Sequence, residues 1–134
     1  MRALVVEDDF ASRRMMQKLL VPYGETDVVV DGAEAIDAFR LAWDESKPYD
    51  LIMMDIMMPR VDGHEAVRRI RGMEREMGIP PVDEVKIIMT TVMEDPKNVV
   101  TAFHEGGVAA YLIKPISIEK FRNELHKLGY AALS

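Results

Sequence analysis

The chain has 134 residues, a formal net charge of −6 and no cysteine. That length fits one domain, and the lack of cysteine excludes a disulfide scaffold, a cysteine-ligated zinc site and a thiol nucleophile. The sequence carries no basic stripe, so direct binding of nucleic acid is not expected. The longest unbroken apolar run, Val108–Ile113, is far short of a membrane span, and the first residues lack the apolar length of a signal peptide. We therefore expect a cytoplasmic protein.

The first part of the chain alternates short apolar runs with amphipathic stretches. Ala3–Val6 is a short apolar run typical of a buried strand, and apolar residues then recur at every fourth position over residues 11–19, as on one face of a helix. Val28–Val30 is a second predicted buried strand. Asp31, with Glu34 three residues later, predicts a helix start resembling a capping box, with Asp in place of Ser or Thr.

The same alternation continues to the end of the chain. Three further buried strands are predicted at Leu51–Met54, Lys86–Thr90 and Ala110–Ile113. The accompanying helices begin at Asp62, at the Asp95-Pro96 pair and near Ser117. The connection Met73–Val85 is longer than such units need, and its Gly78 should end the third helix.

Five strands that alternate with five helices predict an α/β fold. The expected arrangement is a five-stranded parallel sheet with strand order 2-1-3-4-5 and helices on both faces. We expect residues 1–129 to form this single domain and residues 130–134 to form a short C-terminal tail, with no output domain.

Polar residues collect where the predicted strands end. Glu7-Asp8-Asp9 follows the first strand, Asp55 follows the third, Thr90 ends the fourth and Lys114-Pro115 follows the fifth. Because the carboxyl ends of parallel strands lie at one edge, these side chains should lie close together. The acidic cluster and Asp55 come from strands one and three, between which the strand order reverses, and this is where such sheets bind ligands.

Clustered carboxylates repel one another and need a compensating cation. One pair at about 4 Å and an effective dielectric near 20 costs roughly 4 kcal/mol. Carboxylates, a backbone carbonyl and waters suit Mg²⁺, which also binds phosphate. Lys114 would add a fixed positive charge and Thr90 a hydroxyl donor. A carboxylate in these surroundings, Asp55, is a candidate phosphoryl acceptor.

Taken together, these residues resemble the receiver domain of two-component response regulators, over essentially the whole chain. Each motif is weak alone, but their order and spacing are specific. The matching segments are Leu4–Asp9, Met53–Pro59 with Asp62-Gly63, Ile88–Thr90, Gly107 and Tyr111–Pro115. The resemblance implies a flavodoxin-like fold and a signalling switch, not an enzyme with a separate substrate.

The resemblance also implies a role for each matching residue. Asp55 would be the phosphoacceptor, and Mg²⁺ would be bound by Asp9, Asp55 and the backbone carbonyl of Met57, with Asp8 acting through water. The phosphoryl group would come from a sensor histidine kinase or a histidine phosphotransfer protein.

Three further residues would respond to the phosphoryl group. Lys114 would contact it, Thr90 would hydrogen-bond it, and Tyr111 would turn inward as Thr90 moves. The Lys114–Pro115 peptide resembles one that is cis in the family. The helix after Asp95, the strand Ala110–Ile113 and the last helix would then change their surface toward an effector protein, in a monomer or a phosphorylation-dependent dimer.

At two positions beside the site, members of the family carry polar residues that position water, and this chain does not. Met57 lies two residues after Asp55, and Val92 lies two residues after Thr90. Because both are apolar, we expect a long-lived phosphorylated state.

Other interpretations remain open. A haloacid-dehalogenase-like phosphatase also uses an Asp nucleophile and Mg²⁺, but it needs a second Asp where this chain has Met57, which cannot transfer a proton. The sequence does not separate a stand-alone chemotaxis-type regulator from a phosphorelay shuttle, and it allows a piece of a larger regulator.

Overall fold

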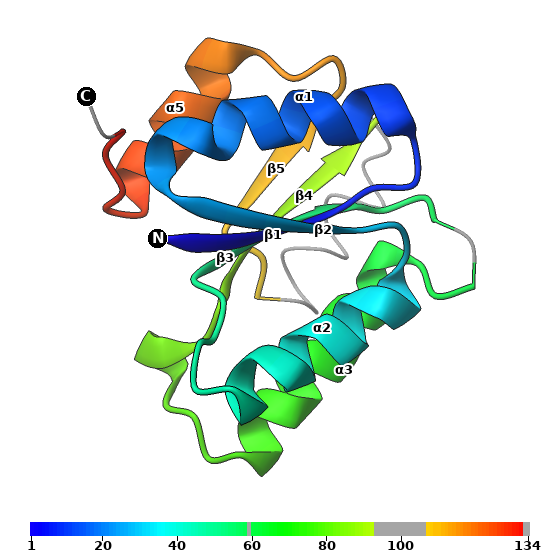
Figure 1. Cartoon of the computed structure of the whole chain (residues 1–134), viewed down its shortest axis with the longest axis vertical. Helices are drawn as coiled ribbons and strands as arrows, with labels where there is room; N and C mark the ends of the chain where they lie inside the picture. The colour runs from blue at the N-terminus through cyan, green and yellow to red at the C-terminus, as the bar shows by residue number, and fades with distance from the viewer. Residues whose placement is uncertain (59, 93–106, 133–134) are drawn as a thin grey trace.

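The protein folds as a three-layer α/β domain, seen in a computed structural model that describes residues 1–58, 60–92 and 107–132 (Figure 1). The strands are β1 (Arg2–Val6), β2 (Glu25–Val29), β3 (Leu51–Asp55), β4 (Lys86–Thr91) and β5 (Ala110–Ile113). The helices are α1 (Phe10–Leu20), α2 (Gly32–Asp44), α3 (Gly63–Glu76) and α5 (Ile118–Lys127), with short 3₁₀ turns η1 (Val21–Tyr23) and η2 (Pro81–Asp83). Among the described helices, none has the length and apolar character to cross a membrane.

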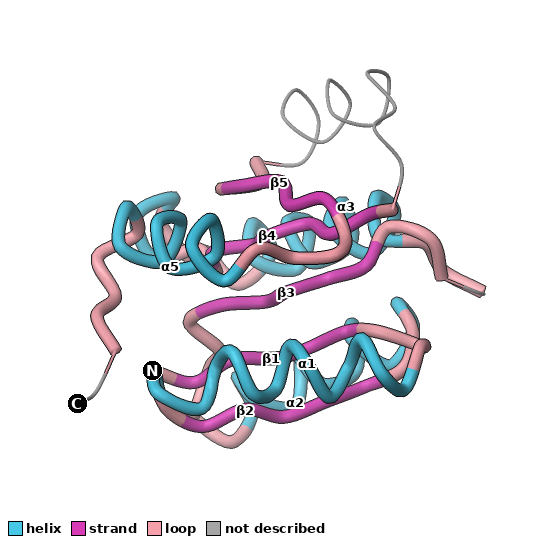
Figure 2. Tube along the Cα trace, turned by 90° about the horizontal axis from the view of Figure 1, so that it is seen from above, coloured by secondary structure: helices cyan, strands magenta, loops and turns pink. Residues whose placement is uncertain are grey.

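All five strands are parallel, and their order is β2-β1-β3-β4-β5, as predicted (Figure 2). Helices α1 and α5 cover one face of the sheet, and α2 and α3 cover the other (Figure 1). Side chains alternate between the faces along each strand: Leu4 and Val6 pack toward α2 and α3, whereas Ala3 and Val5 pack toward α1 and α5. This two-sided burial explains why the inner strands are almost continuously apolar.

Strand β2 differs from the sequence expectation in position and in burial. The buried run Val28–Val30 was expected, but the strand is Glu25–Val29, and three of its five residues are exposed. It lies at the edge of the sheet and pairs only with β1. An edge strand tolerates polar residues such as Glu25 and Asp27, so a search for apolar runs finds only part of it.

The helix starts follow the predicted capping signals. Asp31 accepts a hydrogen bond from the backbone N–H of Glu34, and Asp62 accepts one from Glu65, both at 2.9 Å. Helix α3 ends at Glu76, just before Gly78, whose φ of 71° lies in the left-handed region. The helix predicted to begin at Asp95-Pro96 lies outside the described residues.

One glycine lets α2 approach the loop between β3 and α3. A Cβ atom on Gly32 would lie 2.3 Å from the carbonyl oxygen of Val61. Since this neighbour is backbone, it cannot move aside as a flexible side chain could. The absence of a side chain at Gly32 is therefore what brings the start of α2 against this loop.

A matched pair of glycine substitutions should separate this contact from helix propensity. Gly32→Ala should destabilise the fold by about 1–3 kcal/mol through overpacking. Gly72→Ala, in the middle of α3 where the nearest atom is an arginine nitrogen 3.9 Å away, should instead stabilise it by about 0.5–1 kcal/mol. Urea unfolding of both variants measures this, and equal effects from the two would contradict the proposed contact.

Candidate functional site

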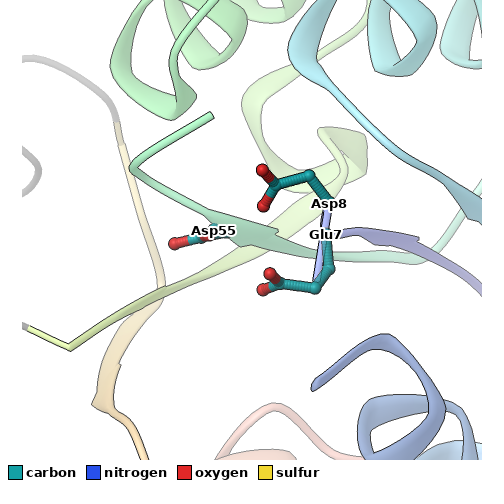
Figure 3. A group of neighbouring side chains, drawn as sticks. All are labelled: Glu7, Asp8 and Asp55. Carbon is teal, nitrogen blue, oxygen red and sulfur yellow. The ribbon is translucent and has the colours of Figure 1, made fainter. Parts of the chain in front are cut away.

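Three carboxylates gather at the carboxyl edge of the sheet, at the point where the strand order reverses. Glu7 and Asp8 follow β1, and Asp55 is the last residue of β3 (Figure 3). One oxygen from each lies within 4.8 Å of the others. Glu7 is fully buried and Asp55 is only 6% exposed, whereas Asp8 is exposed. The predicted meeting of the first and third strand ends is therefore confirmed.

Lys114, which follows β5, brings the positive charge to this group. Its Nζ atom lies 2.6 Å from Oε2 of Glu7 and 3.4 Å from Oδ2 of Asp55. Its backbone N–H donates to the carbonyl of Thr91 at 2.7 Å, which fixes the residue beside β4. The Lys114–Pro115 peptide bond is cis, as the resemblance implies.

Burial sets the protonation chemistry of the site. Desolvation raises the pKa of Asp55, against the attraction of Lys114 and a hydrogen bond from Met57. Burial likewise raises the pKa of Glu7, although its hydrogen bond with Lys114 acts in the opposite direction. Burial opposes the charged form of Lys114 too, but Glu7 and Asp55 raise its pKa above the ordinary value. Among the described side chains, one cation, Lys114, forms ion pairs with this group of three carboxylates.

This donor set fits a hard divalent cation. With all three carboxylates ionised and Lys114 protonated, the group carries an excess of negative charge. Carboxylate oxygens, one of them exposed to water on Asp8, are the ligands that Mg²⁺ prefers, and Mg²⁺ retains several waters when it binds.

The structure places Asp9 differently from the sequence expectation. Asp9 was expected as a metal ligand, but it is the N-cap of α1, and its carboxylate accepts a hydrogen bond from the backbone N–H of Ser12 at 2.9 Å. This bond lowers the pKa of Asp9. Because its carboxylate is committed to the helix start, Asp9 is not in the group with Asp55, and Asp8 and Glu7 are.

Glu7 belongs to the acidic cluster that the sequence predicts at this edge, although the sequence assigned it no role of its own. Its backbone N–H continues the ladder beyond β1, donating to Val29 at 3.1 Å, so its side chain follows the strand's alternation into the protein. The acidic run before the helix was a partial signal, because Asp is favoured at the N-cap. It does not say which acid is the cap, since a backbone N–H lies three residues after each of them.

The remaining predicted residues lie around Asp55. Thr90 is its partner in the register of β3 and β4, and the Thr90 hydroxyl is buried without a hydrogen-bond partner in the described part of the chain. The backbone N–H of Met57 donates to Oδ1 of Asp55 at 3.3 Å. Tyr111 is half-buried and packs against the core cluster under α2 and α3. Thr90 can therefore supply a hydroxyl donor to a new acceptor beside Asp55.

The sequence matches the family described as "Response regulator receiver domain" over residues 3–126. It is 37% identical to Two-component response regulator 24 of Arabidopsis thaliana, over 96% of this chain and 84% of that protein. It is also 33% identical to Probable histidine kinase 2 of Oryza sativa subsp. indica over 94% of the chain, which spans only 12% of that kinase.

The fold is similar to solved structures as well. The receiver domain of the Arabidopsis thaliana histidine kinase CKI1, complexed with Mg²⁺ and BeF₃⁻, superposes with a TM-score of 0.80 at 26% identity. The similarity covers 96% of this chain and 89% of that domain.

Replacing Asp55 should show how much the buried, ionised carboxylate lowers the free energy of unfolding. The unfolded chain ionises Asp55 near the ordinary pKa of about 3.9, whereas the folded pKa is raised. The parent therefore loses stability as the pH rises from the unfolded pKa through the folded one, and the full cost is present above the folded pKa. With chelator present, Asp55→Asn should be more stable than the parent at pH 7 by about 1–3 kcal/mol.

Thermal unfolding between pH 4 and pH 8 would test this. The difference between variant and parent should shrink toward pH 4, where the folded carboxyl is protonated and the unfolded one is already partly so. A variant that is less stable at pH 7, or a difference that does not change with pH, would contradict the proposed electrostatic cost.

Proposed function

The chain belongs to the response regulator receiver domain family, and from this premise we propose that it acts as a switch whose phosphoacceptor is Asp55. The observation that carries the proposal is the position of Asp55: it is buried at the end of β3, with Lys114 at 3.4 Å and two further carboxylates beside it.

In the proposed reaction, a carboxylate oxygen of Asp55 attacks the phosphorus of a phosphohistidine on a partner protein. The new P–O bond forms as the P–N bond breaks, and the imidazole leaves with the electron pair and takes up a proton. Lys114 stabilises the charge on the phosphoryl oxygens from a fixed position. The Thr90 hydroxyl, which has no partner in the described structure, donates a hydrogen bond to the product.

We assign the metal ligands as Asp8, Asp55 and the backbone carbonyl of Met57, with Glu7 beside them and Asp9 taking no part. When bound, Mg²⁺ supplies positive charge for the phosphoryl oxygens and the carboxylates. Glu7 meanwhile holds the Lys114 ammonium through their 2.6 Å contact. The residues of this chain thus orient the acceptor oxygen and keep the cation of Lys114 beside it.

The switch follows from Thr90 and Tyr111. A hydrogen bond from Thr90 to the phosphoryl group draws β4 toward Asp55, and Tyr111, which is half-buried on β5, moves into the space left. The surface at β5 and α5 then differs between the two states, and an effector that prefers one state is coupled to phosphorylation, typically by about 1–3 kcal/mol.

The face around Asp55 supports docking of a phosphodonor protein. Phe10, Met57 and Val92 are each more than half exposed. A groove of about 340 Å³, lined mostly by apolar side chains of α1 and of the segment after β5, lies next to Lys114. Because phosphohistidine must reach a buried acceptor, a partner that covers this apolar rim would exclude water during transfer.

The proposal concerns self-modification, not turnover of a separate substrate. The position two residues after Asp55 holds Met57, which cannot act as the general acid that a phosphatase of the haloacid dehalogenase type needs. The chain spans only 12% of one of its kinase relatives, and the proposed acceptor chemistry is the same in a stand-alone protein and in a domain of a longer regulator.

The phosphoacceptor can be tested by intact-mass spectrometry after incubation with acetyl phosphate, with Mg²⁺ and with chelator. We expect one phosphoryl group per chain with Mg²⁺ and none with chelator, because the buried carboxylates need the cation. Asp55→Asn should take none, while Asp9→Asn, which retains the helix cap, should be phosphorylated like the parent. Phosphorylation of Asp55→Asn, or its loss in Asp9→Asn, would contradict the proposed site.

The lifetime of the phosphorylated state should depend on the two apolar flanking residues. Met57 is 59% exposed and Val92 is 67% exposed, and neither can hydrogen-bond a water molecule that attacks the acyl phosphate. Introducing Met57→Asn together with Val92→Glu should shorten the half-life by about tenfold or more, because polar groups orient that water. The decay is measured by intact mass after removal of the donor.

The matched control keeps both positions apolar. Met57→Leu with Val92→Ile should leave the half-life within about twofold of the parent. A parent half-life as short as that of the polar variant would overturn this account of the two positions.

A further inference from the structure

The loop between β3 and α3 contains a residue with a backbone conformation that needs support. Arg60 has a φ of 66°, in the left-handed region that residues other than glycine adopt uncommonly. Asn is among the side chains that tolerate this region best, and an unbranched cation such as Arg has no local hydrogen bond to favour it. Some contact outside the loop must therefore hold Arg60 in place.

That contact is an ion pair with Asp31 at the start of α2. Nε of Arg60 donates to Oδ2 of Asp31 at 2.9 Å, and a second guanidinium nitrogen donates to the same oxygen. The Asp31 side chain is 7% exposed, although that of Arg60 is 61% exposed. The ion pair thus joins an exposed arginine, Arg60, to a buried carboxylate, Asp31.

Asp31 is itself held firmly. Its other oxygen caps α2 by accepting from the N–H of Glu34 at 2.9 Å, and the Glu34 carboxylate accepts from the N–H of Val30 at 3.0 Å. The next loop residue, Val61, presses its carbonyl against Gly32. Two consecutive residues of the loop are therefore fixed to the first turn of α2.

The other end of this loop carries the acceptor chemistry. Ile56 donates its N–H to Thr90 and accepts one from Gly63, at 3.0 and 2.9 Å. Met57 then lies between this anchor and Arg60, and its N–H bonds Asp55. Met57 therefore lies between two anchored positions, Ile56 and Arg60, and a change at either one can reorient its carbonyl.

We infer that Arg60 is a positioning residue for the metal and phosphoryl site: its ion pair with Asp31 fixes the loop that presents the Met57 carbonyl. The inference rests on the proposed function. Through this ion pair the start of α2, which contributes no ligand, influences the metal affinity indirectly. Support of this kind for a metal ligand typically changes affinity by about tenfold or more.

The test uses Arg60→Asn, which removes the ion pair and keeps a side chain that tolerates the left-handed backbone. The Mg²⁺ concentration that half-saturates phosphorylation by acetyl phosphate should rise about tenfold. At saturating Mg²⁺ the rate should stay within about twofold of the parent. A general loss of structure would instead lower the rate at every Mg²⁺ concentration.

Asp31→Asn provides the partner variant, because its amide oxygen still accepts the cap bond from Glu34 while its charge is lost. It should raise the half-saturating Mg²⁺ concentration as Arg60→Asn does, and the double variant should add little. Arg69→Gln is the control: it breaks an ion pair on α3 whose arginine is exposed to a similar extent as Arg60, although its partner Glu65 is far more exposed than Asp31, and it should change neither the Mg²⁺ affinity nor the rate.

Calorimetric titration with Mg²⁺ keeps this inference separate from the proposed function. A parent that binds Mg²⁺ but takes no phosphoryl group would overturn the proposed reaction alone. An unchanged Mg²⁺ affinity in Arg60→Asn, an equal shift in Arg69→Gln, or fully additive effects of the Arg60 and Asp31 substitutions would overturn the positioning role.

Discussion

The structure depends on one electrostatic constraint, the burial of two carboxylates beside each other with a single lysine between them. Glu7 and Asp55 are both almost inaccessible, and Lys114 lies within 2.6 Å of one and 3.4 Å of the other. Removing two like charges from water is costly, and one cation compensates only part of that cost. The fold maintains this arrangement because Glu7 and Asp55 sit at the ends of the inner strands β1 and β3, and Lys114 reaches them from the end of the edge strand β5.

Lys114 lies closer to Glu7 than to Asp55, so the Asp55 carboxylate is only partly neutralised and can still accept a phosphoryl group. Lys114 is held closely by Glu7, whose buried carboxylate would lose this ion pair if it moved away. Asp55 shares that cation less closely, and the Thr90 hydroxyl next to it is unpaired in the described structure. A phosphoryl group on Asp55 would use interactions that the unmodified site leaves incomplete, which is the property of a switch with two stable states.

The parts of this site that the sequence predicted are those with a strong local signal. Buried strands are recognisable because both faces of the sheet are covered, and Asp55 and Lys114 could be placed since each directly follows such a strand. The edge strand β2 was placed too late along the chain, because one-sided exposure weakens the apolar pattern. The place of Asp9 could not be read from the sequence for a different reason: three consecutive acids precede the helix, any of them could cap it, and only the structure shows that Asp9 accepts the cap bond.

The sequence could not predict contacts between elements that lie far apart along the chain. Asp31 and Arg60 are separated by 29 positions, and no local pattern links a helix cap to a charged loop residue. Yet the same cap that begins α2 also holds the loop after Asp55, so one carboxylate serves both the secondary structure and the site. The acceptor chemistry is set by the strand ends, which many such sheets share, whereas the path of the loops between them depends on contacts of this kind. Differences in metal affinity between proteins with the same acceptor residues should therefore arise in the loops and their anchors.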